Sequence, residues 1–171
     1  LKLNNKRKKI EHNIIKNIDF DKIEKENKNI ILHYDPNINE GLIGIIAARL
    51  KDYFNKPSIV MTNSKNFIKS SARSTSNFNI GRSIRRSLDQ NIISNGGGHN
   101  MAAGFVLKKS NLTIFEKFIQ NDFLRYNTSF DTTFRYDSQI STIAFNKDFF
   151  DDIKKIEPFG SENPLPVFLF K

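Results

Sequence analysis

The segment Ser94-Asn-Gly-Gly-Gly-His-Asn-Met-Ala-Ala-Gly-Phe105 holds four of the eight glycines in this 171-residue chain, three of them in a row before His99. Glycine loses more backbone freedom on folding than any other residue. Such a cluster indicates either a loose linker or a place where the backbone approaches something closely. A linker would be flanked by Ser, Pro or charge, whereas Met101 to Phe105 is small and apolar and leads into an expected strand. We therefore expect this segment to be held against the core.

Two interpretations of the glycine segment remain open on spacing alone. Successive glycines free several backbone N–H groups to point into one concavity, a nest that suits phosphate oxygens. His99 at its edge adds a donor, and a charge when it is protonated. A structural turn with a hydrogen-bonded histidine explains the spacing equally well. A Walker A loop is excluded because no Gly-Lys-Ser/Thr follows, and the G-x-G-x-x-G pattern of dinucleotide-binding proteins is missing.

The composition is that of a globular protein. Hydrophobic residues make up 38% of the chain and include 16 Phe, which is enough to build a core. No apolar run approaches the roughly 20 residues of a membrane helix, so we expect a soluble, cytoplasmic protein. The chain has no cysteine, which excludes disulfides, thiolate zinc sites and a thiol nucleophile. Because it begins at Leu1 and stops directly after the apolar run Val167 to Phe170, we expect a piece of a longer polypeptide.

The net charge of +9 is concentrated in the middle of the chain. Asp89 is the single acid between Asp52 and Glu116. A solvated basic face is one explanation of this pattern. Because the charge surrounds the glycine segment, it favours an anionic partner, with nucleic acid as the first candidate. The bases in this interval are Lys56, Lys65, Lys69, Arg73, Arg82, Arg85, Arg86, Lys108 and Lys109.

Hydrophobic periodicity predicts alternating strands and helices, and hence an α/β fold with a mixed sheet flanked by helices. The expected strands are Ile30 to Tyr34, Pro57 to Thr62, Phe67 to Arg73 and Ala103 to Leu107. The expected helices are Asn4 to Ile18, Gly41 to Phe54, Ile80 to Gln90 and Asn111 to Tyr126. After Asn127 the pattern changes to an exposed strand, Thr132 to Thr142, and a short helix near Asp148 to Ile156.

Four motifs resemble those of the DHH phosphoesterase superfamily, in the same order along the chain. Gly97 to Gly104, GGHNMAAG, resembles the GGH-x-M-A-A-G signature of the DHH-associated domain. Glu40 to Leu50, followed by Lys56 to Val60, is similar to that domain's first helix and next strand, and Ser71-Ala-Arg-Ser74 to its Ser-Gly/Ala-Arg-Ser element. Glu157 to Phe168, EPFGSENPLPVF, resembles the passage that opens the OB-like domain of the RecJ family.

This resemblance implies three regions. Residues 1–28 are a connecting helix region, 29–127 a DHH-associated domain that binds nucleic acid or phosphate, and 128–171 the beginning of a β-rich OB-like domain. The family's activity is 5′-to-3′ exonuclease cleavage of single-stranded DNA in recombination and repair. Its metals, Mn²⁺ or Mg²⁺, belong to a DHH domain that would precede this segment, and no metal site is expected here. The implied partners are single-stranded DNA and a single-strand-binding protein or helicase, without a membrane.

The resemblance also assigns roles to individual residues. Arg73 is the expected phosphate clamp, because its planar fork matches two phosphate oxygens. Gly97, Gly98 and His99 would form the phosphate nest, with His99 supporting catalysis. At position 39 the chain has Asn where related sequences commonly carry His, and Asn hydrogen-bonds but carries no proton. The remaining expected contacts are hydroxyl donors and bases that follow the strand, namely Ser71, Ser74, Arg82, Arg85 and Arg86.

A second class of function stays open. The DHH-associated domain also occurs in nanoRNases and cyclic-dinucleotide phosphodiesterases, and a related module binds nucleic acid in alanyl-tRNA synthetase. The passage from Glu157 to Phe168 argues against these proteins, because they lack the OB-like extension.

Overall fold

The computed structural model describes residues 2–126, 136–160 and 163–171, with side chains from residue 4 onwards. The chain separates into two compact units, residues 1–130 and 131–171, which are described one at a time. The predicted boundary between residues 127 and 128 lies outside the described residues, and the predicted division into three regions stays a prediction.

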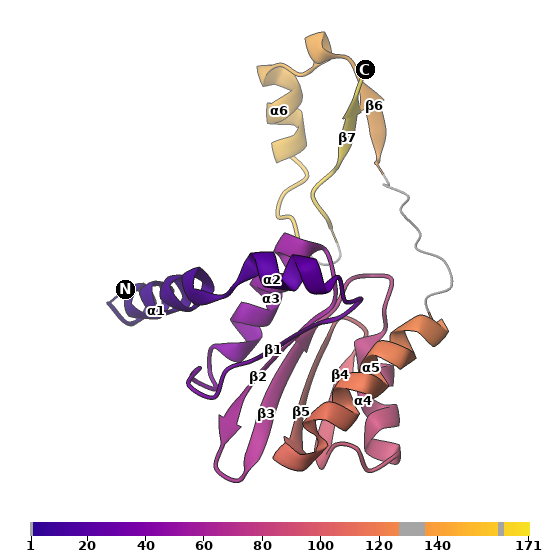
Figure 1. The fold of residues 1–171 in the computed structure, drawn as a ribbon. Coiled ribbons are helices and arrows are strands. Elements are labelled where there is room, and N and C mark those ends of the chain that lie inside the picture. The colour runs from indigo at the N-terminus through magenta and orange to yellow at the C-terminus, as the bar shows by residue number, and fades with distance from the viewer. Residues whose placement is uncertain (1, 127–135, 161–162) are drawn as a thin grey trace. The chain divides into compact units, whose positions relative to one another are not determined.

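The first unit is built on a five-stranded mixed sheet with the strand order β1-β2-β3-β5-β4 (Figure 1). β1 and β2 are parallel and joined through helix α3, whereas all other neighbouring strands are antiparallel. The α/β class with a mixed sheet is therefore confirmed. The strands are β1 (Ile31–Tyr34), β2 (Ser58–Ser64), β3 (Phe67–Arg73), β4 (Asn95–His99) and β5 (Ala102–Lys108).

Helices cover both faces of this sheet. Successive side chains of a strand point to opposite faces, and the strands carry apolar side chains on both. In β2, Val60 packs with α3, while Ile59 and Met61 belong to the opposite hydrophobic cluster. The first face is covered by α1 (Lys2–Asn17), α2 (Phe20–Glu26) and α3 (Ile43–Phe54). The second face is covered by α4 (Ile80–Asp89) and α5 (Leu112–Tyr126), with Phe78, Phe115 and Phe123 fully buried between layers.

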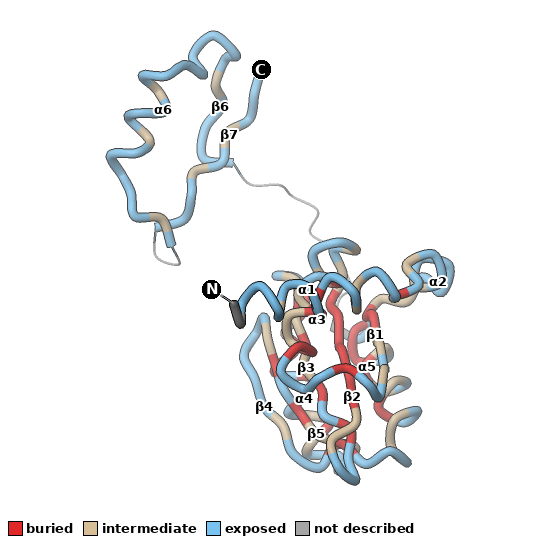
Figure 2. The backbone as a smooth tube through the Cα atoms, turned by 90° about the vertical axis from the view of Figure 1, so that its left-hand side faces the viewer, coloured by how far each residue is buried: buried red, intermediate tan, exposed pale blue. Residues whose placement is uncertain are grey.

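The glycine segment adopts a different conformation from the one expected. Residues 95–99 form the edge strand β4, most of which is exposed (Figure 2), and no glycine among the described residues has a positive φ. The predicted nest is therefore wrong, because a nest needs backbone turns that an extended strand lacks. A Cβ on Gly81 of α4 would lie 2.7 Å from the carbonyl oxygen of His99. Glycine is needed at this position because α4 lies directly on β4.

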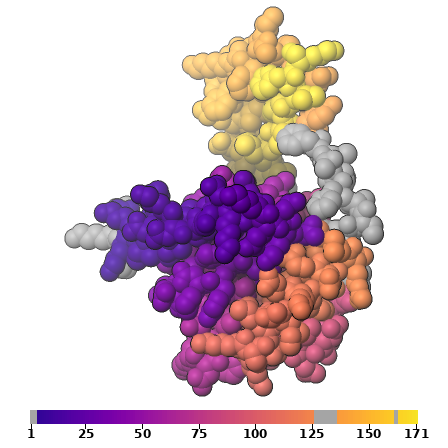
Figure 3. Space-filling model, in the orientation of Figure 1, coloured from indigo at the N-terminus to yellow at the C-terminus, as the bar shows by residue number. Residues whose placement is uncertain are grey.

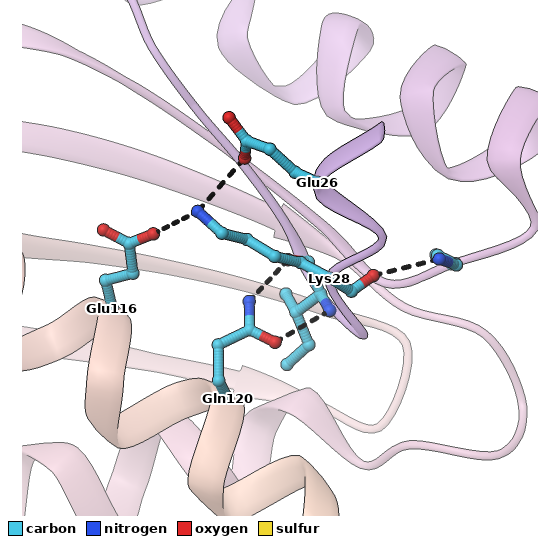
Figure 4. Close-up of polar contacts among 6 residues, drawn as sticks. Glu26, Lys28, Glu116 and Gln120 are labelled. Carbon is cyan, nitrogen blue, oxygen red and sulfur yellow. Dashed lines mark hydrogen bonds and ion pairs between the residues drawn. The ribbon is translucent and has the colours of Figure 1, made fainter. Parts of the chain in front are cut away.

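A polar joint connects the α2–β1 linker to α5 (Figure 4). Lys28 Nζ lies 2.6 Å from Glu116 Oε1 and 3.1 Å from Glu26 Oε2. The hydrogen bond with Glu116 is the main cause that raises the pKa of Lys28, although burial opposes it. The Gln120 carboxamide bonds both the N–H and the carbonyl oxygen of Ile30. In the space-filling view the indigo surface around α2 borders the orange surface of α5 (Figure 3).

The second unit contains a short parallel pair of strands and a helix. These are β6 (Ser138–Ile140), β7 (Phe168–Phe170) and α6 (Lys147–Lys154). The predicted helix near residues 148–156 is confirmed with slightly different bounds. Of the predicted strand 132–142, residues 132–135 lie outside the described residues and β6 occupies part of the rest. Phe149 meets Phe168 edge to face, with ring centroids 5.1 Å apart.

Candidate nucleic-acid interface

Two rows of residues cross the sheet from β3 to the β4 edge. Ser71 pairs with Gly104, which pairs with Gly97, and Arg73 pairs with Ala102, which pairs with His99. Directly opposed strand residues share one face of a sheet. Ser71 also pairs with Val60, whose side chain packs under α3. Both rows therefore lie on the face that carries α3.

Among the described residues, the glycines on the β5–β4 half of that face have open space beside them. α3 packs on β2 and β3. An added Cβ on Gly97 would meet no heavy atom within 4 Å, and one on Gly104 would meet only the Ser70 carbonyl oxygen, at 3.8 Å. We call Gly97 and Gly104 the glycine strip. Without side chains, this strip lets a ligand approach the backbone closely.

Arg73 lies beside this strip, half-buried, in a fixed orientation. Its Nη1 donates to Ser71 Oγ at 3.2 Å and to the Ala72 carbonyl oxygen at 2.8 Å. Gly44, in the first turn of α3, makes room for the guanidinium, because a Cβ there would lie 3.1 Å from Nη2. The side chain thus borders a hollow of about 370 Å³, which we call the α3 hollow. It is lined by Gly41, Gly44, Ile45, Ala48, Arg49, Asp52 and Arg73.

His99 is exposed at the end of β4, and its position is fixed by the following turn. The Met101 carbonyl oxygen accepts a bond from the Ser74 N–H at 2.8 Å. The Asn100 carbonyl oxygen accepts from the Ile80 N–H at 3.1 Å, and its side chain accepts from Asn79 Nδ2 at 2.7 Å. The start of α4 therefore holds the turn that carries the histidine.

Asn39 is exposed just before α3. Its Oδ1 accepts a hydrogen bond from the N–H of Gly41 at 2.8 Å, and its carbonyl oxygen accepts from the N–H of Leu42 at 2.9 Å. The side chain thus shapes the turn that leads into the helix, next to Gly41 of the α3 hollow.

Two of the predicted contact residues have structural roles instead. Ser74 is 1% exposed, and its hydroxyl donates to the Phe78 carbonyl oxygen at 2.6 Å. At this degree of burial the Ser74 hydroxyl is not accessible to a nucleic acid. Arg86 forms a 2.6 Å ion pair with Asp122 of α5, a carboxylate that is only 2% exposed. A buried charge is stable only when paired, which explains the arginine without any ligand.

Arg82 and Arg85 are both exposed on α4, which packs on the opposite face of the sheet from Arg73. They are not part of the two rows, although the start of α4 contacts the backbone of His99. Several of the basic residues are also paired internally. Lys69 forms a 2.8 Å ion pair with Glu40, and this hydrogen bond is the main cause that lowers the pKa of Glu40. The charge excess of the sequence thus overstates the charge available to a ligand.

Sequence reasoning missed Arg49, which lines the α3 hollow with Arg73. Its Nε donates to Glu11 of α1 at 2.9 Å. The available signal was a charged residue within the otherwise apolar first turns of the helix from Gly41 to Phe54.

The chain matches the DHHA1 domain family over residues 27–123, which is more than half of its length. It belongs to the DHHA1 domain family. The DHHA1 match includes the whole five-stranded sheet and both rows of candidate residues.

In addition to matching this family, the chain is similar to RecJ proteins. It is 31% identical over 137 residues to the single-stranded-DNA-specific exonuclease RecJ of Bacillus subtilis, covering 77% of this chain and 17% of that protein. Two crystal structures of RecJ from Thermus thermophilus, in complex with Mg²⁺ and with Mn²⁺, match with TM-scores of 0.75 and 0.76. They are 21% and 22% identical and cover 98% and 99% of this chain. The predicted resemblance to RecJ is confirmed.

The chain spans only about a quarter or less of the length of these relatives. Within the described part of the DHHA1 domain and the second unit, no group of three or more His, Cys, Asp or Glu side chains is placed to hold a metal ion. These residues do not fit a Mg²⁺ or Mn²⁺ site, and the metals of a preceding DHH domain stay a prediction. No helix among the described residues is long and apolar enough to cross a membrane.

Proposed function

We propose that this chain is the strand-binding part of a RecJ-like exonuclease that acts on single-stranded DNA. The observation that carries the proposal is the pair of rows Ser71–Gly104–Gly97 and Arg73–Ala102–His99 on one open face of the sheet. The rows combine a fixed guanidinium, a hydroxyl and an imidazole with bare backbone.

This combination suits a phosphodiester backbone. The Arg73 guanidinium has a planar fork that bonds two phosphate oxygens at once, and Ser71 already fixes one of its nitrogens. Phosphate contacts carry no base information, so we expect binding to any single-stranded sequence. The glycine strip allows the strand to lie close to the sheet, because no side chain stands between them.

Hydrolysis itself belongs to a DHH domain in this proposal. Divalent metals held there would activate water and stabilise the phosphoryl transition state. The residues of this chain hold and orient the strand. The similarity to RecJ of Bacillus subtilis over 137 residues, a longer stretch than the DHHA1 match, supports a RecJ-like parent protein. A single-strand-binding protein or helicase as partner stays a prediction.

The test is binding of the full 171-residue chain to a short fluorescein-labelled oligothymidine strand, followed by fluorescence anisotropy at several salt concentrations. We expect binding that weakens as salt rises, because phosphate contacts release counterions. Arg73→Gln should weaken binding about tenfold and reduce the salt slope by about 1. His99→Ala should weaken it less, because it removes a single hydrogen-bond donor and not a bidentate guanidinium.

The matched control is Lys117→Gln, which removes an exposed base on α5, on the opposite face of the sheet. It should bind as the parent chain does. Equal losses of binding affinity in Arg73→Gln and Lys117→Gln would show that the strand is attracted by net charge alone and would contradict the proposal. Metal-dependent degradation of the strand by a purified chain would contradict the division of labour.

The parent reading frame separates this proposal from its alternative. A DHH domain directly upstream supports a RecJ-like exonuclease, whereas an aminoacylation core upstream indicates the tRNA-binding module of a synthetase. A DHH domain upstream without an OB-like domain downstream indicates a nanoRNase or cyclic-dinucleotide phosphodiesterase.

A further inference from the structure

Arg49 occupies a position from which it reaches the same ligand as Arg73. Both line the α3 hollow, Arg49 from the helix and Arg73 from the neighbouring strand β3. The Arg49 side chain is 63% exposed, so its guanidinium is accessible to a ligand in the hollow.

A buried carboxylate holds Arg49 in place. Glu11 of α1 is 7% exposed as a residue, and its Oε1 accepts a hydrogen bond from Arg49 Nε at 2.9 Å. A carboxylate taken out of water is costly unless it is paired. The pairing occupies Nε, and the end of the guanidinium formed by Nη1 and Nη2 can still bond two phosphate oxygens. Glu11 therefore fixes the side chain and leaves one bidentate edge for an anion.

The charges at the hollow leave a small positive excess, since Arg49, Arg73 and Lys51 stand against Glu11 and Asp52, both of which attract Arg49. Asp52 is the acid in its lining, and it is paired with Lys51 on the same helix. Arg73 and Arg49 add two positive charges to one hollow whose walls include the small residues Gly44 and Ala48. Two fixed guanidinium groups separated by small side chains match successive phosphates better than a single one does.

We propose that Arg49 binds a second phosphate of the strand that Arg73 holds, and that Glu11 is its positioning residue. This inference rests on the proposed function, because it names a further contact in the same site. It assigns a role in binding to α1, which lies outside the DHHA1 match at residues 27–123.

The test compares four variants of the full chain by anisotropy with the labelled oligothymidine strand and by thermal melting. Arg49→Gln removes the charge but leaves Glu11 buried. The double variant Glu11→Gln with Arg49→Gln removes the ion pair as a whole, which separates binding from stability. Arg49→Lys keeps the charge without the fork, and Glu11→Gln keeps the arginine without its partner.

We expect Arg49→Gln and the double variant to bind about five- to tenfold more weakly, with a salt slope reduced by about 1. Arg49→Lys should restore the slope but only part of the affinity, because an ammonium lacks the bidentate fork. Glu11→Gln should keep the full slope and lose affinity only modestly. A purely structural ion pair would lower melting temperatures and leave the salt slopes unchanged.

The outcomes also separate the inference from the proposal on which it depends. If Arg73→Gln weakens binding while Arg49→Gln and the double variant bind as the parent chain does, the role of Arg49 is overturned and the proposed function stands. If the parent chain does not bind the strand at all, both are overturned.

Discussion

Gly97 and Gly98 are neighbours in β4, but only Gly97 has open space beside it. A Cβ on Gly98 would lie 2.5 Å from Ala103 Cα, whereas a Cβ on Gly97 would meet nothing within 4 Å. Gly98→Val should therefore displace β5 and lower the free energy of unfolding by roughly 1–3 kcal/mol. Gly97→Val should leave that free energy unchanged or slightly higher, because valine suits a strand. It should weaken DNA binding by covering the glycine strip.

Urea denaturation and anisotropy on the same preparations check this pair. The two valine variants are matched in size and lie one residue apart, so a general effect of valine would change both properties alike. A Gly97→Val chain that is fully stable and binds DNA as tightly as the parent would remove the glycine strip from the site.

Single residues show why only part of the site could be predicted. The motif and the fork chemistry predict Arg73 and Ser71 as phosphate contacts, and the fold places the two side chains together, although the contact itself stays a proposal. Ser74 belongs to the same motif, but it is buried, and its hydroxyl donates to the carbonyl oxygen of Phe78 four residues further along the chain. Arg86 was an expected contact and Arg49 was not, and the ion pairs that hold them could not be predicted because their partners, Asp122 and Glu11, are distant in sequence.

At the scale of elements, apolar periodicity was sufficient to predict strands and helices wherever apolar and polar side chains follow a regular pattern. The strand Phe67–Arg73 was predicted at its exact bounds, and the helix Ile80–Asp89 to within one residue. β4 was missed as a strand because its three glycines have no side chains to show a period of two. Its extended conformation is set by pairing with β5 and by the packing of α4, which are tertiary effects.

The contact between α4 and α5 includes one buried carboxylate. Asp122 accepts a 2.6 Å hydrogen bond from Ser83 Oγ and forms a 2.6 Å ion pair with Arg86. Arg86→Ala should therefore cost about 3–5 kcal/mol, because it leaves an uncompensated buried charge. Arg85→Ala removes an exposed charge one residue away and should change stability by less than about 0.5 kcal/mol.

Urea denaturation followed by circular dichroism measures both changes. A double variant, Arg86→Leu with Asp122→Leu, removes the pair together and should recover much of the loss, since apolar replacements of a buried pair are often neutral. Equal stability of the Arg86→Ala and Arg85→Ala chains would show that the ion pair has no structural role.

For the molecule as a whole, acid should destabilise the folded state first through His33. This side chain on β1 is partly buried, and burial lowers its pKa from the ordinary 6.5, with Asp35 opposing. Below pH 6.5 the unfolded chain therefore binds more protons than the folded one, and the free energy of unfolding falls as the pH decreases. Well above pH 6.5 neither state holds this proton. Glu40, whose pKa is lowered mainly by Lys69, loses its contribution only below its ordinary 4.5.

Urea denaturation of the full chain between about pH 8 and pH 5 tests this prediction. His33→Gln cannot take up the proton, so its free energy of unfolding should change less on acidification than that of the parent chain. His12→Gln, on the exposed surface of α1, removes a histidine that the fold does not bury and should follow the parent curve. Because both variants lose one imidazole, a curve flattened only by His33→Gln assigns the acid sensitivity to burial on β1. Parallel curves for the parent and His33→Gln would contradict this assignment.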